Sequence, residues 1–408
     1  MAEIMIGFDE ALALILEHVP KGNFREVPLT EATGGILAQD TVSRVDSPSL
    51  DVSLMDGYAV RSEDAAGSGS DNEIGLKISG LTTAGGRSGR LLDAGCAIRV
   101  TTGAPMPAGA DRVLPDESIE KKGERIFCRN GAPAERYILA RGADIRAGET
   151  IAREGEQLHP SLINLLACGG IDRVPVFVPP KVVVIATGDE VVELGQALQP
   201  GQLYASNLAG TAAWLNAFGL SRPVLKILPD NRKKIKAVIN ELLPEVDAFI
   251  TSGGAWRSER DLVAGVLEEL EWRKVFHGVR LRPGKSAGFG LLEGRPFFIL
   301  PGGPASHETA LLKLALPGLM RMAGRSLPIF PEHEVKLAAT VRGKKDWTHV
   351  IFGQTEVVDG IMAVKPYIAS SRLVSMARKD SFILLPEGVE EITAGREIII
   401  QILTPVSF

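Results

Sequence analysis

The sequence has few of the residues that build disulfide frameworks or zinc sites. Its three cysteines, Cys96, Cys128 and Cys168, lie far apart and form no CxxC pair. This spacing favours reduced thiols in a cytoplasmic protein over a network of disulfides. The six histidines are scattered and form no HExxH motif or other ligand pair, which argues against a zinc site.

The sequence also lacks an excess of positive charge and any long apolar run. Its formal net charge is −5, whereas a protein that binds duplex nucleic acid normally carries a basic balance or a basic stripe. The longest apolar candidate, residues 310–322, contains Lys313 and Pro317 and is shorter than the ~18 residues that a membrane-spanning helix needs. The N-terminal stretch carries acids and no basic region, so we expect no secretory signal. We therefore expect neither nucleic acid nor a membrane among the partners.

The residues that are present predict a globular protein of several domains. The chain has 408 residues, which at roughly 150 residues per domain suggests about two to four domains. A hydrophobic content of 45% and a charged content of 23% rule out a largely disordered chain. The 44 glycines and 25 prolines are spread over many turns, which predicts a loop-rich protein.

Helical and β-rich patterns alternate in the first part of the chain. Apolar residues at helical spacing predict an amphipathic helix over 6–20, and a turn with a short helix is expected over 29–38. From 47 to 144, short apolar runs alternate with Gly, Ser and Asp clusters, which is typical of all-β structure. A further helix is expected over 159–168, ending at Gly169.

Strands alternating with helices predict a parallel α/β sheet between residues 181 and 325. The run 182–185 is apolar throughout, as in a strand buried on both faces. Either Asp230 or Asn231 is expected to cap one of the helices. The other expected strands are 224–227, 247–251 and 297–300, and the helices are 207–218, 231–243, 261–270 and 304–322.

From about residue 328 the pattern returns to short strands, which predicts a small β-barrel or sandwich. The expected strands are 334–341, 348–352, 362–367, 382–385 and 397–403. The predicted fold class is therefore a multidomain α/β and β chain. A central parallel, Rossmann-like α/β domain has β-rich domains on either side of it in sequence.

Three glycine-rich turns follow expected strands and form a candidate ligand site. They are Thr187-Gly188-Asp189-Glu190, Ser252-Gly253-Gly254 and Pro301-Gly302-Gly303-Pro304. Ligands bind beyond the C-terminal ends of parallel strands, and glycine lets the backbone approach an anion closely. Each motif alone is an ordinary turn about as often as a site. Three of them at neighbouring strand ends favour a site.

Charged residues near these turns suit an anionic ligand. Arg282 and Lys285 flank a tight turn, which suits an oxyanion such as phosphate, although a solvated turn is the simpler interpretation of this motif alone. Ser370 and Ser371 offer hydroxyls beside a cation, with the same ambiguity. Carboxylates at loops and helix starts usually serve as N-caps. If they gather at one cleft, they can instead bind Mg²⁺. These carboxylates are Asp144, Glu190, Asp230 and Asp261.

Nine short motifs occur along the chain in a characteristic order. The first four are MDGYAV at 55–60, TGAPMPAGAD at 102–111, GADIRAGE at 142–149 and TGDE at 187–190. The others are PDN at 229–231, SGG at 252–254, RPGK at 282–285, LPGGP at 300–304 and SSRLVSM at 370–376. Together they resemble the MoeA and gephyrin E-domain family, the molybdopterin molybdenumtransferases, over essentially the whole chain.

The resemblance implies a four-domain subunit. A linker and dimerisation domain would comprise 1–46 plus 145–180, followed by a β-rich domain over 47–144. The α/β molybdopterin-binding domain would cover 181–325, and a C-terminal β-barrel domain 326–408. The resemblance also implies an elongated homodimer.

The resemblance further implies the final step of molybdenum cofactor biosynthesis. Adenylylated molybdopterin would be cleaved with Mg²⁺, and molybdenum from molybdate would be inserted with release of AMP. Further partners that it suggests are the adenylyltransferase of the pathway and apo-molybdoenzymes.

Roles carry over to the residues at motif positions. Catalytic roles would fall on Asp56, Thr102, Asp144, Glu190, Asp230 and Asp261, of which Glu190, Asp230 and Asp261 would contact Mg²⁺ or the pyrophosphate. Substrate contacts would fall on Thr187, Ser252, Gly253, Gly254, Arg282, Lys285, Pro301, Pro304, Ser370 and Ser371. Asp56 and Thr102 would act across the homodimer, on the α/β site of the other subunit.

Several positions depart from the residues usual in the family. Ala205 replaces an aspartate, Ser286 a proline and Gly303 an asparagine, and residues 255–258 are bulky and basic. Val52 and Leu54 also differ before the MDGYAV motif. The alternative to the enzyme is therefore an altered paralogue that binds or carries the pterin or cofactor, or one that uses tungstate. A scaffold is a third interpretation.

Overall fold

The computed structural model describes residues 5–66, 74–86, 89–128, 135–254, 262–326, 329–358, 360–367 and 373–403. The chain divides into two compact units: unit 1 is residues 1–25 with 176–408, and unit 2 is residues 26–175. The division falls within two paired strands, β1 (Phe24–Pro28) and β12 (Arg173–Phe177). Each unit has a hydrophobic core of its own.

Unit 2 is built on a six-stranded sheet in the order β7-β4-β6-β5-β9-β8, which confirms the expected β structure. Its strands are β4 (Gly57–Val60), β5 (Gly75–Thr82), β6 (Cys96–Val100), β7 (Arg112–Pro115), β8 (Ile119–Lys122) and β9 (Arg125–Cys128). Successive residues of β4 point to opposite faces, so Tyr58 and Val60 join one apolar cluster and Ala59 joins another. Buried apolar residues thus cover both faces of the sheet.

Shorter elements complete unit 2. They are β2 (Thr41–Val42), β3 (Val52–Ser53), β10 (Ile138–Leu139), β11 (Thr150–Ala152), and the helices α2 (Ser62–Ala65) and α3 (Pro160–Cys168). The helix expected over 29–38 is wrong beyond a single 3₁₀ turn, Leu29–Glu31. Gly34 adopts a φ of 81°, and the amides of Gly34 and Leu37 donate to carbonyls of Leu158 and Glu156. These donors therefore pair with a distant segment and not within a helix.

The α/β domain of unit 1 has a mixed sheet in the order β16-β13-β17-β21-β20-β18. The strands are β13 (Val182–Thr187), β16 (Val224–Leu228), β17 (Ala248–Ser252), β18 (Arg273–His277), β20 (Gly288–Leu292) and β21 (Arg295–Leu300). The first four in sheet order are parallel as expected, but β20 pairs antiparallel with both of its neighbours, β21 and β18. Glu293 and Gly294 have φ of 48° and 80°, so a tight hairpin joins β20 to β21. A wholly parallel sheet is therefore wrong at this edge.

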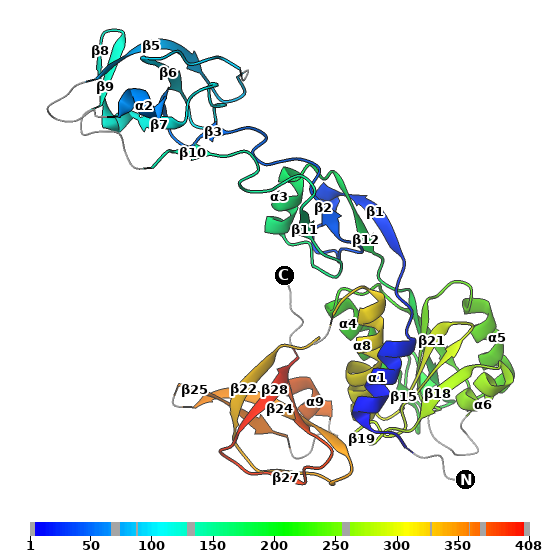
Figure 1. Ribbon diagram of the computed structural model, residues 1–408. Coiled ribbons are helices and arrows are strands. Elements are labelled where there is room, and N and C mark those ends of the chain that lie inside the picture. The colour runs from blue at the N-terminus through cyan, green and yellow to red at the C-terminus, as the bar shows by residue number, and fades with distance from the viewer. Residues whose placement is uncertain are drawn as a thin grey trace. The chain divides into compact units, whose positions relative to one another are not determined.

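Helices cover both faces of this sheet (Figure 1). The helices are α1 (Phe8–His18), α4 (Ser206–Ala217), α5 (Arg232–Leu242), α6 (Leu262–Glu269), α7 (Pro304–Ala310) and α8 (Leu316–Met322), with a π-helical turn at Leu311–Ala315. Residues of α1, α4 and α8 share a core with Val182 and Val184, whereas α5 and α6 pack with Val183 and Ile185. None of the helices in the described ranges is long and apolar enough to cross a membrane.

Residues of α1 pack within unit 1, although we expected residues 1–46 to join 145–180 in a separate domain. Ala11, Ile15 and Val19 are buried in the same cluster as Leu319 and Met322 of the α8 segment. The boundaries of the four expected domains remain a prediction.

The C-terminal strands of unit 1 close into a barrel, as expected. The ring runs β24-β25-β22-β28-β26, and β26 pairs with β24 again. The elements are β19 (Leu281–Arg282), β22 (Glu332–Leu337), β23 (Val341–Arg342), β24 (Thr348–Val358), β25 (Ile361–Pro366), α9 (Leu373–Arg378), β26 (Ser381–Leu385), β27 (Glu391–Ile392) and β28 (Glu397–Ile402). The single strand expected over 334–341 is wrong: β22 ends at Leu337, and β23 pairs separately with β27.

A buried lysine lies where the α/β domain meets the barrel. Lys313, in the π-helical turn, is 4% exposed and bonds Gln401 of β28. Its Nζ lies 5.2 Å and 4.6 Å from the ring centroids of Phe330 and Phe382. Burial lowers the pKa of Lys313 to about 7, although the charge of Glu332 opposes this shift. The charged form of Lys313 is therefore costly in the folded protein.

Replacing Lys313 by Met is expected to stabilise the protein most below pH 7. There the lysine is charged in both the folded and unfolded states, so the full burial cost applies. We expect a gain of about 1–4 kcal/mol in the free energy of unfolding at pH 6. Between pH 7 and the ordinary lysine pKa, only the unfolded state is charged, so wild-type stability rises with pH and the gain shrinks. Urea denaturation of both proteins at pH 6 and pH 9 measures the difference in their free energies of unfolding. A midpoint for Lys313→Met at pH 6 that is equal to or below the wild-type midpoint contradicts the prediction.

Candidate functional site

Three loops meet at the C-terminal edge of the α/β sheet. The parallel neighbours β13, β17 and β21 end at Thr187, Ser252 and Leu300. The loops after them, with the start of α4, line a cavity of about 870 Å³, which we call the cleft. The cleft contains the sequence-predicted residues Thr187, Glu190, Asp230, Ser252, Gly253, Gly254 and Pro304.

Two glycines bring bare backbone to the wall of the cleft. Gly253 and Gly254 have φ of 99° and 65°, where other residues are strained. A Cβ on Gly253 would lie 3.0 Å from the Thr187 carbonyl oxygen, and one on Gly254 would lie 2.8 Å from Val263 Cγ2. The N–H of Gly253 already donates to the Leu300 carbonyl at 3.1 Å. Gly253 therefore lets a ligand come close to the backbone, but its N–H is already used.

Asn207 ties two of the loops together, and the sequence reasoning missed this role. Its Nδ2 donates to Ser252 Oγ and to the Gly302 carbonyl, each at 2.8 Å. Asn207 lies in the first turn of α4 and lines the cleft. The sequence feature that points to Asn207 is the polar pair Ser206-Asn207 at the start of a helix.

A buried histidine supports the loop after β21. His307 of α7 is 2% exposed, and its Nδ1 lies 3.2 Å from the Pro301 carbonyl oxygen. Because a carbonyl only accepts, Nδ1 carries the proton, and Nε2 accepts from the Thr211 hydroxyl at 2.8 Å. Burial lowers the pKa of His307 to about 4, so the ring is neutral at neutral pH. Pro301 is thus a buried support of the loop, while Pro304 lines the cleft.

Two exposed carboxylates, those of Glu190 and Asp230, face the cleft. Asn231 caps α5 by accepting from the Lys234 N–H at 3.1 Å, so Asp230 is not needed as the cap. Asp261, the third acid expected here, lies outside the described residues. Within the described ranges, no group of three or more His, Cys, Asp or Glu residues could hold a metal ion.

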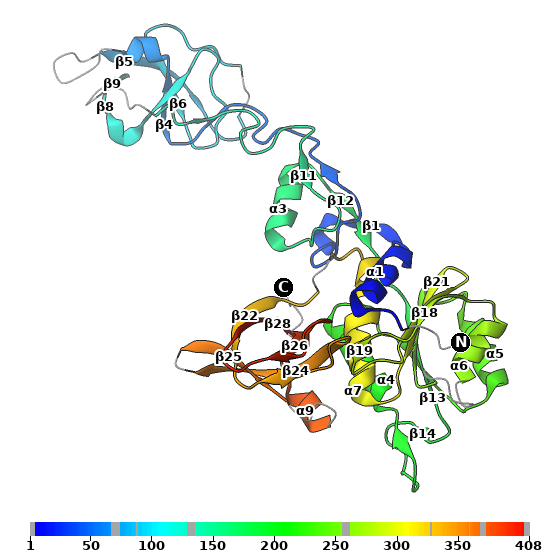
Figure 2. The same ribbon diagram turned by 60° about the horizontal axis from the view of Figure 1, so that its bottom comes forward.

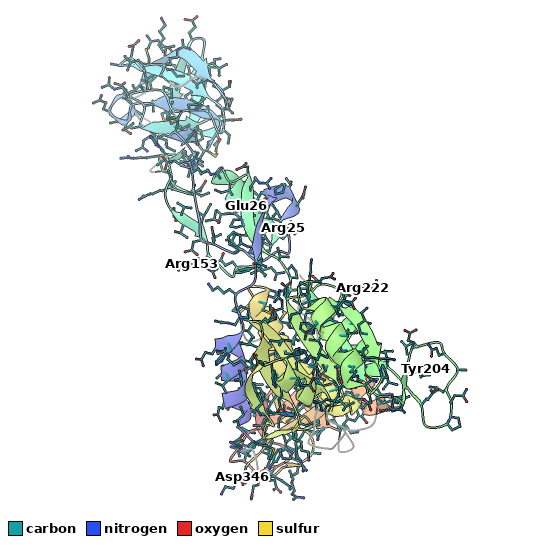
Figure 3. All side chains as sticks on the ribbon, turned by 90° about the vertical axis from the view of Figure 1, so that its right-hand side faces the viewer. Arg25, Glu26, Arg153, Tyr204, Arg222 and Asp346 are labelled. Carbon is teal, nitrogen blue, oxygen red and sulfur yellow. The ribbon has the colours of Figure 1, made fainter. Side chains whose placement is uncertain are left out.

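An apolar rim extends the cleft outward. Leu198, Leu203 and Tyr204 line it, and Leu203 is 60% exposed. Tyr204 lies in β15 (Leu203–Tyr204), which pairs in parallel with β14 (Val191–Val192), on a segment that projects from the α/β domain (Figure 3). The Tyr204 hydroxyl donates to the Gln196 carbonyl at 2.8 Å, and this bond holds Tyr204 to the part of the segment that follows β14.

Strand β19 lies beside β24 of the barrel and pairs with it (Figure 2). Residues of both strands line a second cavity of about 830 Å³. We call it the cationic cavity, because its polar lining residues are Arg282, Lys285, Ser306, Thr340, Arg342, His349 and Tyr367. No Asp or Glu is among the lining residues that the structure describes. Gly302 to Pro304 line the cleft and the next two residues line this cavity, so one segment borders both.

Charge in the cationic cavity comes from several elements. Arg282 of β19 lies opposite His349 of β24, and its guanidinium carbon is 5.5 Å from the Trp347 ring centroid. Burial, and then the charges of Arg282 and Lys344, lower the pKa of His349. The Nε2 of His349 accepts from the Lys344 N–H at 2.9 Å. Arg342 pairs with Glu391 of β27. With His349 neutral, Arg282 and Lys285 leave the cavity positive, which suits an oxyanion.

Unit 2 holds the other sequence-predicted acids. Asp56 Oδ1 accepts from the Thr102 N–H at 2.6 Å and from the Thr102 hydroxyl at 3.0 Å. These bonds are the main reason that the pKa of Asp56 is lowered. Asp144 is exposed, and its N–H donates to the Ser47 carbonyl at 3.0 Å. Ser370 and Ser371 lie outside the described residues.

Comparisons with known proteins agree along the chain. Residues 6–170 match the model of the MoeA N-terminal region (domain I and II), and residues 183–321 match that of a probable molybdopterin binding domain. Molybdopterin molybdenumtransferase 2 of Mycobacterium tuberculosis is 31% identical over 93% of this chain and 95% of its own length. The molybdopterin molybdenumtransferase of Haemophilus influenzae is 30% identical over 97% of this chain and 98% of its own.

A solved structure shares the fold over nearly the whole chain. The crystal structure of the molybdopterin biosynthesis MoeA protein from Pyrococcus horikosii superposes with a TM-score of 0.85. The two sequences are 31% identical, and the match covers 98% of this chain and 99% of the Pyrococcus chain.

Proposed function

Since the chain belongs to the MoeA family of molybdopterin molybdenumtransferases, we propose that it is a transferase that inserts molybdenum from molybdate into adenylylated molybdopterin and releases AMP. The observation that carries the proposal is the pair of cavities bordered by the segment 302–306. The cleft has carboxylates, glycine loops and an apolar rim, which suit a pterin nucleotide with its phosphates. The cationic cavity suits molybdate.

Mg²⁺ fits the residues at the cleft, and we propose Glu190 and Asp230 as its ligands. Mg²⁺ prefers oxygen ligands and is often held by one or two carboxylates plus substrate phosphates, so two facing carboxylates suffice. When bound, the ion would neutralise charge on the phosphate linkage as AMP leaves. Asp261 remains a predicted third ligand. The chain's own glycine loops at 253–254 and 302–303 would admit the phosphates closely.

We propose that the active protein is a homodimer in the cytoplasm. In it, Asp56 and Thr102 of one copy would complete the α/β site of the other, as the family resemblance implies. Asp144, Ser370 and Ser371 would contribute at the same site. The adenylyltransferase of the pathway and apo-molybdoenzymes are proposed as further partners that deliver the substrate and receive the cofactor.

The test is AMP release from adenylylated molybdopterin by the purified protein with Mg²⁺ and molybdate. We expect AMP and cofactor to form together and to depend on molybdate. Parallel reactions with tungstate measure which oxyanion is used. Tight pterin binding without AMP release, with either oxyanion, would favour the altered paralogue that binds or carries the pterin.

Molybdate binding is expected to strengthen as the pH falls from 7.5 to 5.5. Burial is the main cause of the lowered pKa of His349, and the charges of Arg282 and Lys344 add to it. A bound dianion favours the protonated ring and so raises this pKa, which means that binding takes up a proton. The affinity then rises by at most about tenfold per pH unit, the limit for one coupled proton. Isothermal titration with micromolar molybdate measures the slope, and sulfate serves as a second dianion. His349→Gln should flatten the slope, and an unchanged slope in that variant contradicts the assignment.

A further inference from the structure

The surroundings of Asp56 include an arginine with no assigned role. Asp56 immediately precedes β4, and Thr102 occupies one carboxylate oxygen, Oδ1. Among the described residues, Oδ2 has no hydrogen-bond partner and Asp56 is exposed. The position of this free oxygen depends on what holds the start of β4.

Arg99 of β6 fastens the start of β4 to the end of β7. Its Nη1 donates to the Gly57 carbonyl at 2.9 Å and to Asp116 Oδ1 at 2.7 Å, and Nη2 donates to Asp116 Oδ2 at 2.7 Å. The guanidinium carbon also lies 5.1 Å from the ring centroid of Tyr58, the residue that pairs with Arg99 across the strands. Arg99 is thus held by a bidentate ion pair, a carbonyl and an aromatic face.

Asp116 closes the arrangement from the other side. Its backbone N–H donates to the carbonyl oxygen of Asp56 itself, at 3.3 Å. Asp116 and Arg99, paired with each other, therefore hold the two successive carbonyls of Asp56 and Gly57. The backbone of Gly57 packs closely against β7, because a Cβ there would lie 2.2 Å from the Leu114 carbonyl oxygen, so no larger residue fits without a shift.

We propose that Arg99, with Asp116, is a positioning residue that fixes Asp56 for the reaction. This inference rests on the proposed function, in which Asp56 acts at the site of a second copy. Arg99 does not contact the Asp56 carboxylate directly. Arg99 fixes the backbone that carries this carboxylate, and the positive charge of Arg99 stabilises the ionised carboxylate.

A merely structural role predicts a different outcome. The side chains of Arg99 and Asp116 are 29% and 48% exposed, and an exposed ion pair contributes only about 0–1 kcal/mol to stability. A structural pair would therefore leave turnover unchanged once the protein is folded. A positioning pair changes turnover without a comparable change in stability.

The test replaces Arg99 by Met in the full-length protein and measures single-turnover AMP release. We expect the rate to fall about tenfold, with the KM for adenylylated molybdopterin within about twofold of wild type. The pKa of Asp56 is lowered mainly by the hydrogen bonds from Thr102, and the charge of Arg99 lowers it further. Without Arg99 this pKa rises, so the acid limb of the pH–rate profile should move to higher pH. Arg99→Lys should recover part of the rate, since it keeps the charge but loses the bidentate geometry.

Two controls separate the possible outcomes. Arg44→Met breaks another exposed Arg–Asp pair of unit 2, with Asp172, and should leave the rate unchanged. In an Asp56→Asn background, Arg99→Met should cost little further. An equal loss in both backgrounds, or a wild-type rate in Arg99→Met, overturns the inference. Where Asp56→Asn has no measurable rate, an unshifted acid limb in Arg99→Met overturns it.

Asp116→Asn breaks the same ion pair from its other side, so it tests the inference if Arg99→Met does not fold. A wild-type rate in Asp116→Asn also overturns the inference. Failure of the wild-type protein to release AMP instead refutes the proposed function. The two failures are therefore distinguishable.

Discussion

Replacing Glu190 by Gln or Asp230 by Asn is expected to lower the rate of AMP release by about 10²–10³-fold, as is usual when one electrostatic stabiliser of a transition state is removed. Both substitutions keep the shape of the side chain and remove its charge at the cleft. The loss of a carboxylate weakens the proposed Mg²⁺ site, so the Mg²⁺ concentration needed for half-maximal rate should also rise. Single-turnover assays over a range of Mg²⁺ concentrations measure both effects.

A matched control distinguishes this effect from a general loss of negative charge. Glu269→Gln removes an exposed carboxylate of α6 that pairs with Arg232 and Lys236, and Glu269 does not line the cleft. Its rate should remain within about twofold of wild type. Wild-type rates for both Glu190→Gln and Asp230→Asn, at every Mg²⁺ concentration, would move the reaction elsewhere.

Replacing Arg282 or Lys285 by Met is expected to weaken molybdate binding by about 10–100-fold. A hydrogen bond to a charged group contributes about 1.5–3 kcal/mol, and each residue supplies one cation to the cationic cavity. The KM for molybdate should rise by a similar factor, whereas the KM for adenylylated molybdopterin should change little, because these residues line the other cavity. Direct titration with molybdate and steady-state kinetics measure the two effects separately.

Arg321→Met provides the matched control for this pair of substitutions. Arg321 is an exposed cation of α8 that lines neither cavity. Its removal changes the net charge equally and should not alter molybdate affinity. If all three variants bound molybdate as wild type does, the oxyanion would have to bind outside the cationic cavity.

Elements with strong local patterns could be predicted from the sequence. The apolar run in β13 predicts a strand buried on both faces, and helical spacing predicts α1. The three glycine turns follow strands whose parallel order brings their ends together, which is why the cleft could be expected. Nine of its lining residues belong to those turns: Thr187, Gly188, Glu190, Ser252, Gly253, Gly254, Gly302, Gly303 and Pro304.

Features that depend on contacts between distant segments could not be predicted. Asn207, His307 and Arg99 act through bonds to residues far along the chain, and a single side chain carries no pattern that reveals such a partner. The antiparallel edge of the sheet differs from these features, because it has a local signal. This signal is the two-residue turn Glu293-Gly294, which joins β20 to β21 directly, whereas parallel strands are joined through a helix.

The segment at 302–306 borders the cleft on one side and the cationic cavity on the other. Asn207 holds it at the Gly302 carbonyl, and His307 holds the Pro301 carbonyl just before it. An occupant of one cavity that shifts this segment therefore changes the free energy of binding in the other. Such coupling is reciprocal: the factor by which the pterin nucleotide alters molybdate affinity equals the factor by which molybdate alters affinity for the nucleotide. Either order of binding would then lead to the same ternary complex with the same total free energy of binding.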